Sequence, residues 1–259
     1  MLDFCGDVLE IDLADGEPDA VRAILDDAFG PCDLLLSDRP IAVPQLFVSD
    51  MDSTMIDAEC IDELADFAGL KPQIAEITER AMRGELDFET ALTERVGLLA
   101  GLDESAIRQC LDDRITAMRG ARTLVETLKH RGCRTVLVTG GFHAFADPVA
   151  EMLGFERTVA NRLGVDDGKL TGKLASEIVD SSVKKSTLEE EMAQLPEGAR
   201  SLATGDGAND IPMIAAATYG VAYYAKPKAR AAADGWIERG DLTALLQLFE
   251  IPREDWVAD

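Results

Sequence analysis

Apolar residues recur along the chain with two different periods. Short apolar runs that predict buried strands occur at 44–49, 134–139, 199–205 and 219–224. Amphipathic stretches that predict helices lie between and after them, at 120–132, 143–154, 184–195 and 208–217. Asp167 and Gly168 have the residue types of a tight hairpin turn between two further short strands. Strands that alternate with helices are typical of an α/β fold with a doubly wound parallel sheet.

Residues 57–115 follow a different pattern. Apolar positions recur there with helical spacing at 60–70, 72–82 and 88–102, and no strand-like run interrupts them. We therefore expect a helical-bundle cap inserted after the first core strand. The predicted organisation is a short N-terminal β-α-β segment of unknown role at 1–42, a core formed by 43–56 and 116–259, and the cap at 57–115.

Composition and charge exclude several classes of function. The formal net charge of −24 disfavours a nucleic-acid partner, whose phosphates it would repel. No stretch approaches the roughly 18–20 apolar residues of a membrane span. The N-terminal stretch carries acids where a signal peptide carries Lys or Arg, so we expect a cytoplasmic protein. Five scattered cysteines and two histidines argue against a disulfide framework and a zinc site. The oligomeric state stays open, a dimer included.

Polar side chains follow the predicted strands, where ligands bind in such sheets. Asp50 and Asp52 follow the first core strand, Thr139 and Gly140 the second, and Asp206 a later one. Carboxylates without imidazole or thiolate partners favour Mg²⁺ over zinc. One carboxylate of such a site can attack a phosphoryl group, and another can transfer the protons. A hydroxyl group, glycine amides and a lysine would bind the doubly charged phosphate group of the substrate.

Four motifs resemble those of the haloacid-dehalogenase-like phosphatases. They are DMDST at 50–54, VTGGF at 138–142, a downstream lysine and GDGAND at 205–210. Within that family the chain is most similar to the phosphoserine phosphatases, through DMDSTMIDAECIDELA, AMRGELDFETALTERVGLL, ANRL with DGKLTG, and GDGANDIPMIAAA. The resemblance runs from about Val43 to Phe249. It implies Mg²⁺-dependent hydrolysis of the small molecule O-phospho-L-serine through an aspartyl phosphate, the last step of serine biosynthesis.

The same resemblance implies a role for each matching residue. Asp50 would be the nucleophile and a metal ligand, and Asp206 a second ligand. Asp52 would be the general acid and base and give the metal its backbone carbonyl. Lys184, in preference to its neighbour Lys185, would neutralise Asp50 and the phosphate.

The remaining implied roles concern the substrate. Its phosphoryl group would meet Thr139, Gly140 and Asn209, its ammonium and carboxylate would meet Glu59 and Arg95, and Met82 and Phe88 would close the pocket. The family most often has serine at the position of Thr139, so an extra methyl group enters the phosphate site here.

Two other functions stay open from the sequence. The same residues could dephosphorylate another small phosphomonoester such as phosphothreonine, or transfer phosphate to homoserine. A signalling receiver phosphorylated on aspartate also combines acids, a threonine and a lysine on a parallel sheet. The helical insert and the second aspartate, Asp52, argue against a receiver.

Overall fold

The protein is built around a seven-stranded sheet with the strand order β3-β11-β10-β9-β4-β5-β6. The computed structural model describes residues 2–5, 8–13, 16–83 and 85–258. All neighbouring strands of this sheet are parallel except β3 and β11. The strands are β3 (Leu34–Leu35), β4 (Leu46–Ser49), β5 (Arg134–Phe142), β6 (Arg157–Asn161), β9 (Ser201–Gly205), β10 (Tyr219–Tyr223) and β11 (Gly235–Ile237). The expected α/β class with a doubly wound parallel sheet is confirmed.

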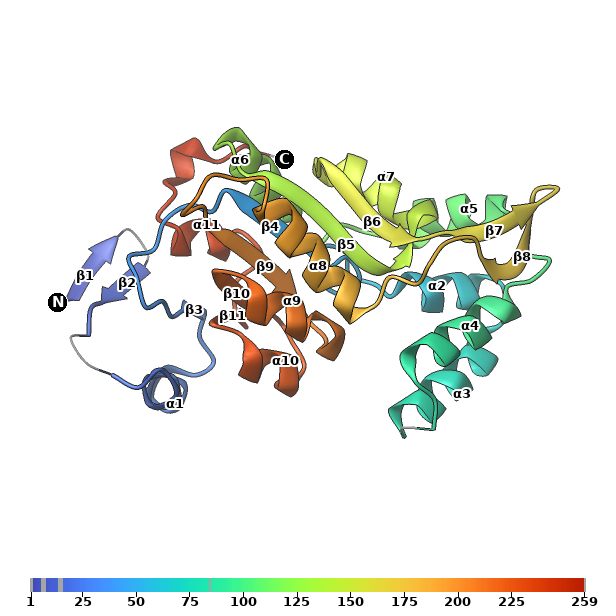
Figure 1. Ribbon diagram of the computed structural model, residues 1–259, viewed down its shortest axis with the longest axis horizontal. Coiled ribbons are helices and arrows are strands. Elements are labelled where there is room, and N and C mark those ends of the chain that lie inside the picture. The colour runs from blue at the N-terminus through green and yellow to red at the C-terminus, as the bar shows by residue number, and fades with distance from the viewer. Residues whose placement is uncertain (1, 6–7, 14–15, 84, 259) are drawn as a thin grey trace.

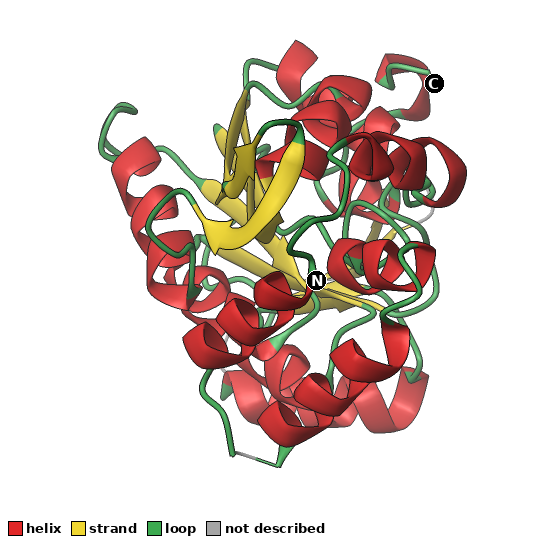
Figure 2. Cartoon of the chain, turned by 90° about the vertical axis from the view of Figure 1, so that its right-hand side faces the viewer, coloured by secondary structure: helices red, strands yellow, loops and turns green. Residues whose placement is uncertain are grey.

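Helices cover both faces of the sheet (Figures 1 and 2). Because successive side chains of a strand point to opposite faces, β4 contributes to two cores. Phe47 packs in the core beneath α6 (Ala121–His130), α7 (His143–Leu153) and α11 (Ala244–Leu248). Leu46 and Val48 pack on the other face with α8 (Ser181–Met192) and α9 (Ile211–Ala216). All three side chains are fully buried, so β4 is held firmly where Asp50 follows it.

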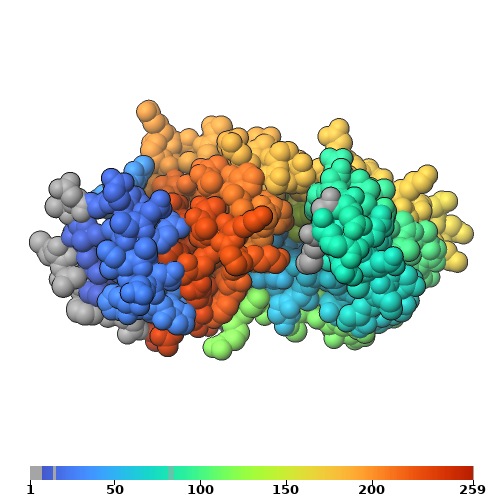
Figure 3. Space-filling model, turned by 90° about the horizontal axis from the view of Figure 1, so that it is seen from below, coloured from blue at the N-terminus to red at the C-terminus, as the bar shows by residue number. Residues whose placement is uncertain are grey.

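Four helices lie between β4 and α6 in the chain: α2 (Cys60–Phe67), α3 (Lys71–Met82), α4 (Phe88–Leu98) and α5 (Ser105–Arg114). They lie at one end of the molecule with the hairpin β7 (Leu163–Asp166) and β8 (Lys169–Leu174) (Figure 1). The hairpin joins them through backbone hydrogen bonds from Gly101 to Leu170, from Leu170 to Leu102 and from Glu104 to Gly168. In Figure 3 a recess separates α3 and α4 from the C-terminal part of the core.

The N-terminal residues lie at the opposite end of the molecule (Figure 3). β1 (Leu2–Cys5) and β2 (Val8–Ile11) form an antiparallel pair, α1 (Pro18–Phe29) follows, and β3 adds to the edge of the main sheet. The carboxylate of Asp33 accepts the backbone N–H groups of residues 238, 239 and 240 at 2.7–2.9 Å. Arg230, in α10 (Pro227–Ala232), lies 3.9 Å above the buried Trp236 ring and pairs with Asp26 of α1 at 2.6 Å. The helix α1 and the segment that follows it are thus bonded to the core.

The structure also has elements that the sequence pattern did not predict, namely β1, β11 and α5. The hairpin turn at Asp167 and Gly168 is confirmed, with φ of 48° and 72° between β7 and β8. The proposed domain boundaries remain predictions. Among the described residues, every helix is too short or too polar to cross a membrane.

Candidate active site

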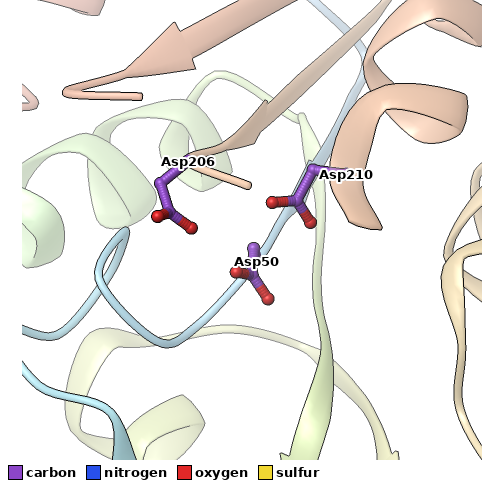
Figure 4. A group of neighbouring side chains, drawn as sticks. All are labelled: Asp50, Asp206 and Asp210. Carbon is purple, nitrogen blue, oxygen red and sulfur yellow. The ribbon is translucent and has the colours of Figure 1, made fainter. Parts of the chain in front are cut away.

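Three carboxylates converge at the carboxyl ends of the central strands (Figure 4). Asp50 directly follows β4, Asp206 directly follows β9, and Asp210 ends the short 3₁₀ helix Ala208–Asp210. One oxygen from each lies within 4.8 Å of the others. Because β4 and β9 are adjacent parallel strands with Ser49 opposite Thr204, their carboxyl ends bring these aspartates together. All three side chains are buried, so their charges need compensation.

Lys184 supplies part of that compensation. Its ammonium group donates hydrogen bonds of 2.6 Å to Asp50 Oδ1 and to Asp210 Oδ1, and the residue is only 1% exposed. Although burial alone would lower the pKa of Lys184, the two carboxylates raise it, so the lysine is charged. Burial and the carboxylate of Asp210 raise the pKa of Asp50 well above its usual value, against the effect of Lys184. Lys185 points elsewhere and pairs with Glu189 at 3.5 Å.

Asp52 lies two residues beyond Asp50 in a different environment. It is half-buried, and its Oδ1 accepts the N–H of Cys60, the first residue of α2, at 3.3 Å. Burial and the nearby carboxylate of Glu59 raise the pKa of Asp52 to about 7. Asp52 Oδ2 lies 3.2 Å from where a Cβ atom on Gly141 would stand. A carboxyl group with this pKa can both donate and accept a proton near neutral pH.

The residues 139–141 form an irregular stretch of β5 beside Asp52. The register of β5 against β6 shifts between Val138 and Phe142. The N–H of Gly141 donates to Thr139 Oγ1 at 2.9 Å, which leaves the hydroxyl proton of Thr139 free for another acceptor. A side chain at Gly141 would crowd Asp52 and Thr139, so glycine keeps the space beside these two groups open.

The helices α2 and α4 bring other predicted residues toward this edge. Glu59 precedes α2 and accepts a hydrogen bond of 3.0 Å from Ser53, which has a positive φ of 57°. Arg95 is half-buried, and its Nε donates to Ala91 O at 3.3 Å. Burial lowers the pKa of Arg95, and among the described residues no carboxylate lies within ion-pair distance of its guanidinium. The guanidinium is therefore available to an external anion.

Phe88 begins α4, and its ring lies 3.3 Å from where a Cβ on Gly140 would stand. The ring therefore lies beside the stretch 139–141. Met82 ends α3, and its side chain lies outside the described part of the structure. Asn209 is half-buried in the 3₁₀ helix between Asp206 and Asp210.

Three residues of this region were given no part in the predicted site. Asp210 has no role of its own in the sequence analysis, although its carboxylate accepts a hydrogen bond from Lys184. Lys226 follows β10 and pairs with Asp206 at 3.1 Å. Asn161 ends β6 and bonds Gly140. Two of the three carried a signal, because Asp210 stands within the GDGAND motif and Asn161 within the ANRL stretch of the family resemblance; Lys226 stands in neither.

Comparison with known proteins identifies the family. The model of the haloacid dehalogenase-like hydrolases matches residues 47–215, which contain the aspartates and Lys184. The chain is a haloacid dehalogenase-like hydrolase. Two relatives, both called phosphoserine phosphatase, come from Haemophilus influenzae, 43% identical over 78% of this chain, and Streptococcus thermophilus, 44% identical over 80%. The chain spans 65% of the length of the first protein and 97% of the second.

Solved structures of this hydrolase family resemble the fold. One, described as a phospho-aspartyl intermediate analogue of phosphoserine phosphatase, is 38% identical and has a TM-score of 0.71. The alignment covers 79% of this chain and 98% of that structure.

The donor set of this hydrolase suits the divalent metal that its family generally uses. Asp50, Asp206 and Asp210 offer only carboxylate oxygens, the ligands that hard cations prefer. Both carboxylate oxygens of Asp210 already accept hydrogen bonds. Lys184 donates to Oδ1, and the N–H of Gly207 donates to Oδ2 at 2.9 Å. Asp50 Oδ2 and the carboxylate of Asp206 remain open to a cation; within the described part of the chain, the ion pair of Asp206 is with the exposed Lys226.

Proposed function

We propose that the protein hydrolyses O-phospho-L-serine to L-serine and phosphate through a phosphoaspartate on Asp50, with Mg²⁺ as cofactor. The observation that carries the chemistry is the pairing of two unlike aspartates. Asp50 is buried against Lys184, whereas Asp52 is half-buried with a pKa of about 7. One carboxyl group is thus suited to attack and the other to proton transfer. The names and identities of the relatives support the substrate.

In the first half of the reaction, the carboxylate of Asp50 attacks the phosphorus atom of the monoester. Lys184 holds this carboxylate in place through a hydrogen bond of 2.6 Å to Oδ1. The new bond joins a carboxylate oxygen of Asp50 to phosphorus, and the bond between phosphorus and the serine oxygen breaks. Protonated Asp52 gives its proton to that leaving oxygen. L-serine then departs as a neutral alcohol at its side chain.

In the second half, Asp52 is a carboxylate and takes a proton from a water molecule. The water oxygen bonds to phosphorus, the bond from phosphorus to Asp50 breaks, and inorganic phosphate is released. Asp50 is again a carboxylate and Asp52 again a carboxylic acid. A pKa near 7 lets the same group serve in both halves at neutral pH.

Mg²⁺, held by Asp50, Asp206 and the backbone carbonyl of Asp52, would neutralise charge on the phosphoryl group. The hydroxyl of Thr139 and the backbone at Gly140 are proposed to bind phosphoryl oxygens, with Asn209 nearby. The free hydroxyl proton of Thr139 supports this role.

The amino-acid part of the substrate is proposed to lie toward the helical insert. A zwitterion needs one anion and one cation. Glu59 would bind its ammonium, and Arg95, which lacks an ion pair among the described residues, would grip its carboxylate with a planar two-point contact. Met82 and Phe88 would close the pocket. The insert 57–115 would then act as a lid that excludes bulk water from the phosphoenzyme.

The test is phosphate release from L-phosphoserine, L-phosphothreonine, phosphoethanolamine, phosphoglycolate and an aryl phosphate, each with Mg²⁺ and with chelator. We expect strong preference for L-phosphoserine, dependence on Mg²⁺ and loss of activity in Asp50→Asn. Even activity across the panel would reject the substrate while keeping the chemistry. No turnover of any compound would reject both.

A further inference from the structure

We infer that Asn161 is a positioning residue that sets the phosphate-binding stretch 139–141 in place, an inference that rests on the proposed phosphatase function. Asn161 is the last residue of β6 and is completely buried. Neither composition nor motif spacing gave it a role. Its two amide atoms contact two separate segments that flank the candidate phosphate site.

The first contact is a hydrogen bond to a bulge in β5. Val138 pairs with Val159 and Phe142 pairs with Asn161, so three residues of β5 stand opposite the single residue Ala160 of β6. Such a bulge leaves backbone groups of residues 139–141 without their regular hydrogen-bond partners in β6. Without other contacts, the orientation of these peptide groups would not be fixed. The side chain of Asn161 replaces a missing partner, because its Nδ2 donates to the carbonyl oxygen of Gly140 at 2.8 Å.

The second contact fastens the segment that leads into α8. Asn161 Oδ1 accepts the N–H of Val179 at 2.8 Å. Val179 precedes Asp180, whose carboxylate caps α8 by accepting the N–H groups of Ser182 and Val183. Lys184 lies in the first turns of that helix.

One buried amide therefore links the bulge to the base of the helix that carries the lysine. Val179 O is 3.6 Å from where a Cβ on Gly140 would stand, so the two linked segments are neighbours. Asn161 contacts neither the reacting atoms nor the three aspartates. Its expected effect is on the direction of the Gly140 and Gly141 amides and on their distance from Lys184, and hence on the binding of phosphate oxygens.

Two substitutions separate this role from packing. Asn161→Ala removes both hydrogen bonds without adding charge, and Asn161→Asp keeps the shape and the acceptor for Val179 but loses the donor to Gly140. Ser176→Ala is the matched control. Ser176 Oγ accepts the N–H of Arg162 at 3.1 Å, so it ties the residue after β6 to the same segment without touching Gly140.

The readouts are binding of inorganic phosphate in the presence of Mg²⁺ and binding of Mg²⁺ alone, by thermal-shift titration of the full chain. We expect both Asn161 variants to bind phosphate roughly tenfold more weakly, the factor that loss of one buried hydrogen bond can produce. Mg²⁺ affinity should stay within about twofold, because the proposed ligands Asp50 and Asp206 directly follow β4 and β9, which Asn161 does not bond. Ser176→Ala should leave both unchanged.

Phosphate affinity within about twofold of the unaltered protein in Asn161→Asp would overturn the inference. So would equal weakening of phosphate and Mg²⁺ binding, or an equal effect of Ser176→Ala. If Asn161→Ala does not fold, Asn161→Asp decides by the same criterion. Neither readout needs turnover, so an unaltered protein that binds phosphate but does not hydrolyse phosphoserine would reject the proposed substrate without affecting this test.

Discussion

The adjacent residues Lys184 and Lys185 allow a sharp test of the electrostatics of the site. Lys184→Met removes an ammonium group that bonds two buried carboxylates at 2.6 Å each. Lys185→Met, one position along the same helix, removes an exposed ammonium group that faces Glu189 at 3.5 Å. The two variants share the substitution, the helix and the change in net charge. They differ in burial and in the number of ion pairs lost.

The expected loss of stability follows from that difference. Breaking a buried ion pair by removing one partner costs about 3–5 kcal/mol, because the remaining charge is left uncompensated in a poorly solvated place. An exposed pair at i,i+4 spacing is worth about 0.3–0.5 kcal/mol. We therefore expect Lys184→Met to lose at least about 3 kcal/mol in the absence of metal, and Lys185→Met less than about 0.5 kcal/mol.

Urea unfolding in chelator measures both values. With an m-value of about 3 kcal/mol per M, the midpoint should fall by about 1 M for Lys184→Met and hardly at all for Lys185→Met. Added Mg²⁺ should recover part of the loss in Lys184→Met, since the cation would face the charge of Asp50. Equal midpoints for the two variants would refute the assignment of Lys184 as the charge that holds Asp50 and Asp210 together.

Three further outcomes are expected. Asp52→Asn should lower kcat by about 10²–10⁴. The folded-state pKa of Asp52 is raised to about 7, so the wild type loses stability as pH rises from about 4 to 7. At about 1.4 kcal/mol for each pKa unit, the neutral variant should therefore gain roughly 3–4 kcal/mol over wild type at pH 8 but not at pH 4, in urea unfolding with chelator; a difference independent of pH would contradict the raised pKa. Asp206→Asn should abolish the stabilisation of about 2.7 kcal/mol expected at 100 times the Mg²⁺ dissociation constant, followed by thermal unfolding, and full retention would exclude Asp206 as a ligand. Arg95→Ala should raise KM for L-phosphoserine roughly tenfold or more while leaving phosphoethanolamine, which has no carboxylate, unaffected; parallel losses on both compounds would remove Arg95 from substrate selection.

Long periodic segments were predictable from the sequence, whereas short or cross-strand features were not. The alternation of β4, β5 and β9 with their helices follows from runs of β-branched and apolar residues. β11 has only three residues, too few for a period to emerge. Its place in the sheet depends on pairing with β10 and β3, which local sequence does not encode.

In the site, too, residues placed by local sequence were predictable, whereas residues that depend on contacts between distant segments were not. Asp50 and Asp206 stand directly after strands, so parallel topology alone predicts their convergence. Asn161 lies in the ANRL stretch of the family resemblance, but its role could not be predicted, because it depends on the register of β6 against a bulge about twenty residues earlier in the chain. The contact between Asp210 and Lys184 likewise requires two helices to meet, and only the three-dimensional structure brings them together.

The edge strand β3 and the contact of Arg230 with the Trp236 ring connect the N-terminal segment to the end of the main sheet. The match to the family ends at residue 215, before β10 and β11, and begins after α1 and β3. Yet Asp26 anchors the arginine that covers Trp236, and Asp33 accepts three N–H groups just beyond β11. A fragment cut at residues 47 and 215, the limits of the family match, would expose a sheet edge and release these bonds together. The family match and the bonded structure of this chain therefore have different boundaries, and the second is the longer.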